Sequence, residues 1–379
     1  MIPYLDLHAV NAPYAEALKT ALSGVVDSGW YLFGSQVSSF EREWARYCGL
    51  SDAHADAVTD AGDGGEACKS CVACANGLDA LRLVLRAWIE MGRLRRGDEV
   101  IVPANTYIAS ILAVSDNGLV PVPVEPDAES WLLDPARVEA SITARTRALL
   151  PVHLYGQLCD MDALMQIADA HGLLVLEDCA QSHGVSPRYR GTAQAWSFYP
   201  GKNLGALGDA GAVTSSDAEL IETIRRIAFY GSSRKYVHIY KGLNSRMDEL
   251  QAAVLRLKLK DLDRCNACRR EMALRYSSEI VSPLVTLPVA KGPHVYHIYP
   301  ILSPRRDALR QYLADLGIRT QIHYPIPPHR QQAYSEWRHL SFPITERIAS
   351  QELSLPCNQS LSPQDVTSVI DALNAFRGE

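Results

Sequence analysis

The sequence lacks the long apolar stretches and the basic excess that are typical of membrane and nucleic-acid-binding proteins. None of its hydrophobic runs approaches the roughly 20 residues that a membrane-spanning helix needs. The segment 1–6 has no basic region followed by an apolar stretch, so we expect no secretory leader and a cytoplasmic location. The net charge of −6 provides no cationic excess to displace counterions from phosphates. We therefore expect neither a membrane nor a nucleic acid as a partner.

Cysteine is not scarce, because the chain has nine, and their spacing raises the question of a metal site. The run Cys68–Cys74 reads C-x-x-C-x-x-C, and Cys265–Cys268 reads C-x-x-C, spacings that occur in zinc and iron–sulfur proteins. However, residues 71–75 have the pattern of a short strand, in which successive side chains point to opposite faces. Cys265–Cys268 lies in a helical pattern. We therefore expect buried or loop cysteines and no metal site.

The order of apolar runs predicts an α/β protein with two domains. At 379 residues the chain exceeds one compact core, and we expect a large domain at 1–250 and a smaller α+β domain at 251–379. Strands and helices alternate from about residue 70 to 216, which favours a mostly parallel sheet sandwiched by helices. The segment 51–69, rich in Asp, Ala and Gly, is interpreted as an inserted surface loop. The expected strands are 99–104, 120–125, 148–154, 173–177, 195–199 and 211–215, and the expected helices include 80–90, 161–171, one from about 247, and 363–376.

An acidic residue and a lysine each follow a predicted strand. Asp178 follows the strand 173–177, and Lys202 follows the strand 195–199. Neighbouring parallel strands end at one edge of a sheet, where α/β proteins place ligands. Pyridoxal 5′-phosphate requires such a pair, because a lysine amine forms the Schiff base and a carboxylate keeps the pyridine nitrogen protonated. We predict this cofactor; the alternative is a core aspartate and a surface lysine on unrelated loops.

Motifs along nearly the whole chain carry a resemblance to a known family. They are Ser28–Gly34, Asn76–Leu81, Gly97–Pro103, Val152–Gly156, Glu177–Gly184, Ser197–Gly205, Gly242–Arg246 and Ile322–His329. The chain resembles the DegT/StrS-type sugar aminotransferases, a fold-type-I pyridoxal phosphate family that acts on nucleotide-linked keto-sugars. The resemblance implies the fold-type-I α/β architecture, with Lys202 and Asp178 as the catalytic residues.

The cofactor's phosphate needs backbone donors and a helix N-terminus. Gly77, Leu78 and Asp79 open a predicted helix and fit that need, with glycine allowing a close approach of the chain. Ser197 resembles the family serine whose hydroxyl contacts the phosphate. Asn244 resembles the asparagine that reaches the phosphate from the neighbouring subunit. The resemblance therefore implies a homodimer with shared active sites.

The cofactor ring is expected to have two further neighbours. Gln181 resembles the family residue that donates a hydrogen bond to the ring oxygen. Tyr107 is the candidate for stacking on the ring. The alternatives are a polar group at a helix N-terminus for Gln181 and a plain core tyrosine for Tyr107.

Two further segments concern the substrate. Tyr230–Tyr236 and Ile322–His329 resemble the branch that aminates dTDP-linked 3-keto-6-deoxyhexoses. The first segment supplies positive charge for a diphosphate, and the second offers donors on a proline-stiffened loop. The alternative for the second segment is a rigid connector with incidental histidines. The candidate substrate-binding residues are Tyr199, Arg234, Lys235, His323, Tyr324 and His329.

Together these features predict transfer of an amino group to a nucleotide-linked keto-6-deoxyhexose, with L-glutamate as the donor that the family implies. We favour a 3-keto sugar linked to dTDP. A 4-keto-sugar or aminocyclitol aminotransferase of the same family remains an alternative. A non-catalytic regulatory protein that binds the cofactor or a nucleotide sugar is the alternative from another class, which the set Asp178, Gln181 and Lys202 disfavours.

Overall fold

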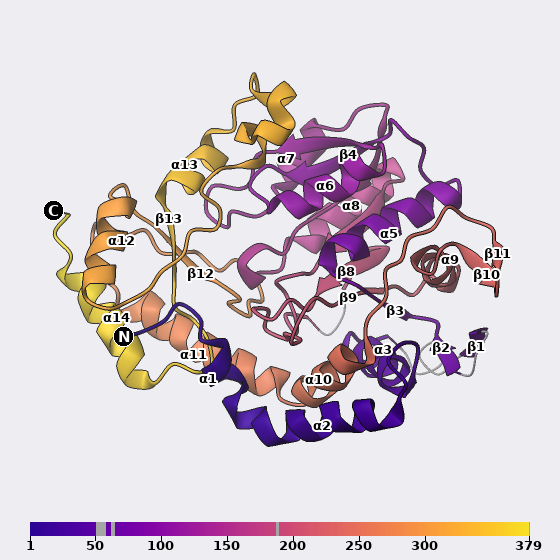
Figure 1. Cartoon of the computed structure of the whole chain (residues 1–379). Helices are drawn as coiled ribbons and strands as arrows, with labels where there is room; N and C mark the ends of the chain where they lie inside the picture. The colour runs from indigo at the N-terminus through magenta and orange to yellow at the C-terminus, as the bar shows by residue number, and fades with distance from the viewer. Residues whose placement is uncertain (51–57, 62–64, 187–188, 379) are drawn as a thin grey trace.

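A computed structural model of the chain describes residues 1–50, 58–61, 65–186 and 189–378. A seven-stranded sheet with the order β3-β9-β8-β7-β6-β4-β5 forms its centre (Figure 1). Neighbours from β8 to β5 are parallel, whereas β9 is antiparallel to both β8 and β3. The prediction of a mostly parallel, mixed sheet is confirmed. The strands are β3 (Cys71–Cys74), β4 (Glu99–Pro103), β5 (Val120–Val124), β6 (Thr146–Leu149), β7 (Leu174–Asp178), β8 (Ala193–Ser197) and β9 (Gly211–Thr214).

The sequence placed the expected strands within two residues of their observed bounds, with one exception. The strand expected at 148–154 is β6, which ends at Leu149, because the next residues turn toward Asp178 and the chain enters a short 3-10 turn, Leu154–Gly156. The strand expected at 195–199 is β8, which begins and ends two residues earlier. Buried runs such as Glu99–Pro103 explain why the pattern was readable, since parallel strands are covered on both faces.

Helices flank the sheet (Figure 1). The helix α5 (Gly77–Glu90) begins where β3 ends, and its N-cap Asn76 accepts a hydrogen bond from the N–H of Asp79 at 2.9 Å. Apolar side chains on one side of α5, such as Leu81 and Trp88, are buried in the main core. The other helices between the strands are α6 (Ile108–Asp116), α7 (Pro135–Ala140), α8 (Met161–His171) and α9 (Ala218–Ala228).

The N-terminal helices form a layer with a helix that comes later in the chain. The helix α10 packs on both α2 and α3. Glu249, in the first turn of α10, accepts hydrogen bonds from the N–H groups of Gly34, Gln36 and Val37. It thereby satisfies backbone N–H groups at the start of α3 that have no acceptor within that helix. This layer comprises α1 (Leu7–Asn11), η1 (Ala12–Tyr14), α2 (Ala15–Ser28), α3 (Ser35–Tyr47) and α10 (Glu249–Leu259).

A second core lies in the C-terminal part of the chain. The strands β12 and β13 pair antiparallel, and helices cover them (Figure 1). Ile2, at the opposite end of the chain, joins this core. The expected boundary at 250/251 falls inside α10, which belongs with α2 and α3, whereas the second core starts with α11. The elements of this part of the chain are α11 (Leu262–Glu279), β12 (Tyr299–Leu302), α12 (Arg306–Asp315), η3 (Pro328–Arg330), η4 (Gln332–Trp337), α13 (Pro343–Gln351), β13 (Glu352–Leu355) and α14 (Pro363–Ala375). Tyr334 of η4 and Ile348 of α13 are buried in the main core and not in the second one.

The segment 51–69, expected to be an inserted surface loop, contains two short strands. The strands β1 (Val58–Ala61) and β2 (Gly65–Cys68) form an antiparallel hairpin, with Val58 opposite Cys68. Local pairing of two short strands accounts for this, whereas the remainder, 51–57 and 62–64, lies outside the described residues. Within the described part of the chain, no helix combines the length and the apolar character that crossing a bilayer requires.

Candidate active site

A cavity of about 950 Å³ opens beyond the carboxyl ends of β7 and β8. This is where an α/β sheet places its ligands. The N-terminal segment, α5, the β7 and β8 ends and the C-terminal core all contribute to its wall. Among the residues predicted from the sequence, those that line it are Gly77, Leu78, Tyr107, Asp178, Gln181, Ser197, Tyr199, Lys202, His323 and Tyr324.

The carboxylate of Asp178 is held in one orientation. Its Oδ2 accepts a hydrogen bond from the hydroxyl of Ser110 at 2.8 Å, and its Oδ1 accepts one from the N–H of Ala180 at 3.1 Å. Its backbone is fixed as well, because its N–H donates to the carbonyl of Pro151 and its carbonyl accepts from the backbone N–H of His153. The side chain therefore presents a fixed negative charge to the cavity.

Lys202 follows β8 in a turn closed by its own N–H, which donates to the carbonyl of Tyr199 at 2.8 Å. Burial lowers the pKa of its amine to about 8, while the charge of Asp178 acts in the opposite direction. About a fifth of an amine with this pKa is neutral at pH 7.4, a far larger fraction than for an ordinary lysine, and the neutral form is the one that a nucleophile needs.

The residue after the lysine anchors this turn. Asn203 donates from Nδ2 to Asn266 Oδ1 at 2.8 Å and to the carbonyl of Val295 at 3.2 Å. Its Oδ1 must then be the acceptor for His297 Nδ1, which lies 3.0 Å away. This network fixes His297 as the tautomer that is protonated on Nδ1, with Nε2 as its acceptor atom.

The start of α5 forms a cradle for an anion. The amides of Gly77 and Leu78 are in the first turn, where no intrahelical acceptor exists, and both residues line the cavity. A Cβ on Gly77 would lie 2.5 Å from Ser197 Cβ, so only glycine lets these two segments approach. Asp79 does not line the cavity: its carboxylate accepts a hydrogen bond from Ser245 at 2.7 Å.

Gln181 connects the sheet to the C-terminal core. Its Oε1 accepts a hydrogen bond from the N–H of Tyr155 at 2.6 Å, and its Nε2 lies 3.2 Å from the hydroxyl of Tyr324. The ring of Tyr324 lies with its centroid 5.0 Å from that of Tyr107. The amide orientation follows from the Tyr155 N–H, which requires an oxygen acceptor.

His323 lines the cavity beside Tyr324. Its Nδ1 lies 2.7 Å from the hydroxyl of Ser354, and its N–H donates to the buried carboxyl of Glu352 at 2.6 Å. Burial lowers the pKa of His323 to about 4, and the charge of Lys202 adds to the effect. The imidazole is therefore neutral at physiological pH.

Four predicted residues besides Asp79 lie outside the cavity wall. His329 is buried against Glu346, with Nε2 to Oε1 at 2.9 Å, and does not face the cavity. Arg234 and Lys235 lie exposed on the hairpin of β10 (Ser232–Arg234) and β11 (Val237–His238). Asn244 is exposed too, although its neighbour Ser245 is tied to the start of α5.

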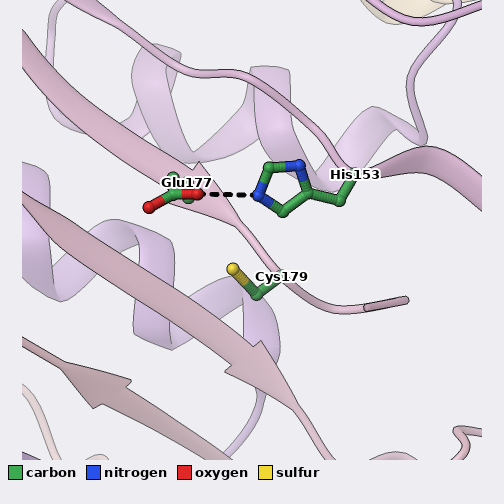
Figure 2. A group of neighbouring side chains, drawn as sticks. All are labelled: His153, Glu177 and Cys179. Carbon is green, nitrogen blue, oxygen red and sulfur yellow. Dashed lines mark hydrogen bonds and ion pairs between the residues drawn. The ribbon is translucent and has the colours of Figure 1, made fainter. Parts of the chain in front are cut away.

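Three buried side chains, two of them from the residues on either side of Asp178 in the sequence, form a polar group (Figure 2). His153, Glu177 and Cys179 bring ligand-type atoms within 4.8 Å of one another. Glu177 Oε2 lies 2.8 Å from His153 Nε2, while its Oε1 accepts from the N–H groups of Arg190 and Gly191. The imidazole Nδ1 accepts from a backbone N–H at 3.2 Å. Since His153 and Glu177 are already satisfied by the protein, we interpret the group as a support for the β7 end.

Sequence reasoning missed several residues at the cavity or its support. Ser110 orients Asp178, and Thr106 contacts Ser110 at 2.9 Å; both lie in a segment where only Tyr107 was singled out. His297 and Arg269 line the cavity from the C-terminal core. No local signal identifies these last two, because they reach the site only when the second core packs against the sheet.

Comparisons with known proteins identify the family of this chain. The profile of the DegT/DnrJ/EryC1/StrS aminotransferase family matches residues 65–374. The chain is 48% identical to dTDP-3-amino-3,6-dideoxy-alpha-D-galactopyranose transaminase of Aneurinibacillus thermoaerophilus, over 99% of both chains. It is 45% identical to dTDP-3-amino-3,4,6-trideoxy-alpha-D-glucose transaminase of Streptomyces venezuelae, over 99% of this chain and 96% of the relative. The crystal structure of S. venezuelae DesV in complex with a ketimine intermediate is similar with a TM-score of 0.89 at 45% identity, over 98% of this chain and 97% of that one. The chain therefore belongs to the DegT/DnrJ/EryC1/StrS aminotransferase family.

Proposed function

We propose that this aminotransferase uses pyridoxal 5′-phosphate to transfer an amino group from L-glutamate to C3 of a dTDP-linked 3-keto-6-deoxyhexose. The observation that carries the proposal is the arrangement of Lys202, Asp178 and the start of α5 around one cavity. The relatives that are 45% and 48% identical are named as transaminases of dTDP-3-amino sugars, which supports the choice of C3.

The cavity fits this cofactor. The amides of Gly77 and Leu78 and the hydroxyl of Ser197 would hold the phosphate, and Asp178 would face the pyridine nitrogen. When bound, the cofactor supplies an electron sink for the carbon that loses its proton. Gln181 would donate to the ring oxygen from Nε2, since its Oε1 already accepts from the backbone. Tyr107 would cover the ring.

Lys202 has two tasks in this proposal. Its Nζ would hold the cofactor, and its neutral amine would then act as the base that moves a proton to and from the substrate carbon. Its lowered pKa suits both tasks, because each requires a neutral amine. Neutral His323, together with Tyr199 and Tyr324, would offer hydrogen-bonding groups to the sugar hydroxyls.

We propose a homodimer in which Asn244 completes the partner's phosphate site. The surface around Asn244 supports this, because exposed aromatic side chains gather there. Arg246 lies over the rings of Phe33, Phe229 and Tyr230, each of which is more than a third exposed. An exposed apolar patch of this kind is typical of an interface. Arg234 and Lys235, on the adjoining hairpin, would then meet the diphosphate of the nucleotide sugar bound by the partner.

The test uses the purified protein loaded with pyridoxal phosphate. L-Glutamate alone should convert its visible absorption band to that of the amine form of the cofactor. Addition of a dTDP-linked 3-keto-6-deoxyhexose should restore the band and yield a sugar whose amine NMR places on C3. An amine on C4 would contradict the position, whereas no spectral response to any amino acid would contradict the reaction.

A further inference from the structure

Arg269 is a buried cation that has no anionic partner among the described residues. The residue is 4% exposed and lies in α11. Its Nη1 donates to the carbonyls of Tyr296 at 3.1 Å and His297 at 3.2 Å, and also to that of Cys357. Its Nε has no hydrogen-bond partner among the described residues. Backbone carbonyls therefore accept its hydrogen bonds, and no carboxylate does so, although a buried charge is ordinarily paired.

The guanidinium borders the active-site cavity, which it reaches from the C-terminal core. Burial lowers its pKa, and the described groups that counter this effect are two thiols and one phenol, none of them a carboxylate. An arginine keeps its proton even so. The cavity wall thus holds a positive charge whose counterion is missing from the described protein.

Arg269 also lies close to the reacting lysine. It donates to the carbonyl of His297, and the imidazole of His297 lies 3.0 Å from Asn203, the residue that follows Lys202. In keeping with this geometry, the charges of Lys202 and Arg269 both lower the pKa of His297, after the larger effect of burial. The cations that line the cavity are Lys202, Arg269 and Arg319, and the carboxylates are Asp178 and Asp209. Asp178 is already assigned to the cofactor ring. An anion that binds near both Lys202 and Arg269 must therefore come from a ligand.

We propose that Arg269 is the subsite for the α-carboxylate of the amino donor. The inference rests on the proposed transamination, because the amine that displaces Lys202 carries its carboxylate on the adjacent carbon. That carboxylate must lie near the lysine. Arg269 lines the same cavity as Lys202, and it donates to the carbonyl of His297, whose imidazole contacts Asn203, the residue after Lys202. A planar guanidinium matches a carboxylate in shape and charge. The nucleotide diphosphate is the competing anion, but it is separated from the reacting carbonyl by the sugar.

The first experiment measures each half-reaction separately in Arg269→Lys and Arg269→Met. Loss of a buried charged partner should raise the half-saturating concentration of L-glutamate about tenfold in the lysine variant and about a hundredfold in the methionine variant. L-Alanine, which has only the α-carboxylate, should be affected equally. The half-saturating concentration of the dTDP-sugar should stay within about twofold. Equal losses for both substrates, or none for the amino acids, would overturn the proposal.

Arg270→Met is the matched control. Arg270 follows in the same helix but is exposed, so its replacement should leave both half-reactions unchanged. If Arg269→Met does not fold, a structure of the wild-type holoenzyme with glutarate, an unreactive dicarboxylate, decides. We expect a carboxylate of glutarate to contact the guanidinium of Arg269. Glutarate bound away from Arg269 would contradict the proposed subsite. If the wild-type protein does not react with glutamate, the proposed function is refuted. The structure with glutarate then tests separately whether Arg269 binds a carboxylate.

Discussion

At the scale of single residues, the amine of Lys202 is prepared for reaction before any cofactor arrives. Burial lowers its pKa from the ordinary 10.5 to about 8. Below that pH, the neutral fraction falls tenfold with each unit. We expect the rate at which apoprotein condenses with pyridoxal phosphate to rise with pH and level off above about 8. Stopped-flow measurement of the visible band across pH 6–10.5, at constant ionic strength, checks this. The midpoint of the profile should be located to within about half a pH unit.

The variant Asp178→Asn tests the direction in which the charge of Asp178 shifts the pKa of Lys202. The charge of Asp178 raises the pKa of Lys202, so its removal should move the midpoint of the profile to lower pH. The same variant should transaminate far more slowly, because the ring nitrogen loses its charge partner. A midpoint near the ordinary lysine value, or a shift to higher pH in Asp178→Asn, would contradict the described environment.

Glu177 is a residue whose role is structural support of the site. Glu177→Ala would leave the buried His153 and the N–H groups of Arg190 and Gly191 without their acceptor. We expect a loss of about 3 kcal/mol in the free energy of unfolding, measured by urea titration. Glu177→Gln, which keeps one carbonyl acceptor, should lose less. A loss under about 0.5 kcal/mol for Glu177→Ala would show that the group is not a support.

At the scale of elements, the phosphate cradle depends on how closely α5 approaches β8. Gly77→Ala would place a Cβ 2.5 Å from Ser197 Cβ and 3.1 Å from its Cα, so the helix start must move. We expect the dissociation constant for pyridoxal phosphate to rise at least about tenfold and stability to fall by about 1–3 kcal/mol. Equilibrium dialysis and urea titration measure the two effects.

Gly24→Ala provides a control of the same chemical change. Gly24 lies inside α2, with nothing within 4 Å of a Cβ built on it. Alanine there should stabilise the protein by up to about 1 kcal/mol through helix propensity, with no effect on the cofactor. Unaltered cofactor affinity in Gly77→Ala would mean that the phosphate binds away from the start of α5.

At the scale of the whole molecule, the proposed dimer makes each site depend on two chains. Lys202→Ala and Asn244→Ala should each be inactive or weak alone. Random exchange between equal amounts of the two should restore activity in about one quarter of all sites, because each hybrid has one intact site. The exchange is followed by mass-tagged chains. Full exchange without recovered activity would place the role of Asn244 within its own chain.

The sequence by itself determined the sheet and the two central residues. Buried apolar runs at β4 and β7 indicate parallel strands. Asp178 is the last residue of β7, and Lys202 follows the end of β8. Their position at one sheet edge follows from local order along the chain together with the parallel arrangement. The glycine and the cap at the start of α5 are equally local. These features need no knowledge of distant contacts.

Only the tertiary structure decided which other side chains reach the cavity. His329 shares a motif with His323, yet it turns into a contact with Glu346, 17 positions away, while His323 faces the site. Arg269 belongs to none of the motifs, and it lines the cavity because the second core packs beside the sheet. Side-chain direction and the desolvation of a charge depend on packing between segments far apart in sequence, which a linear pattern does not encode.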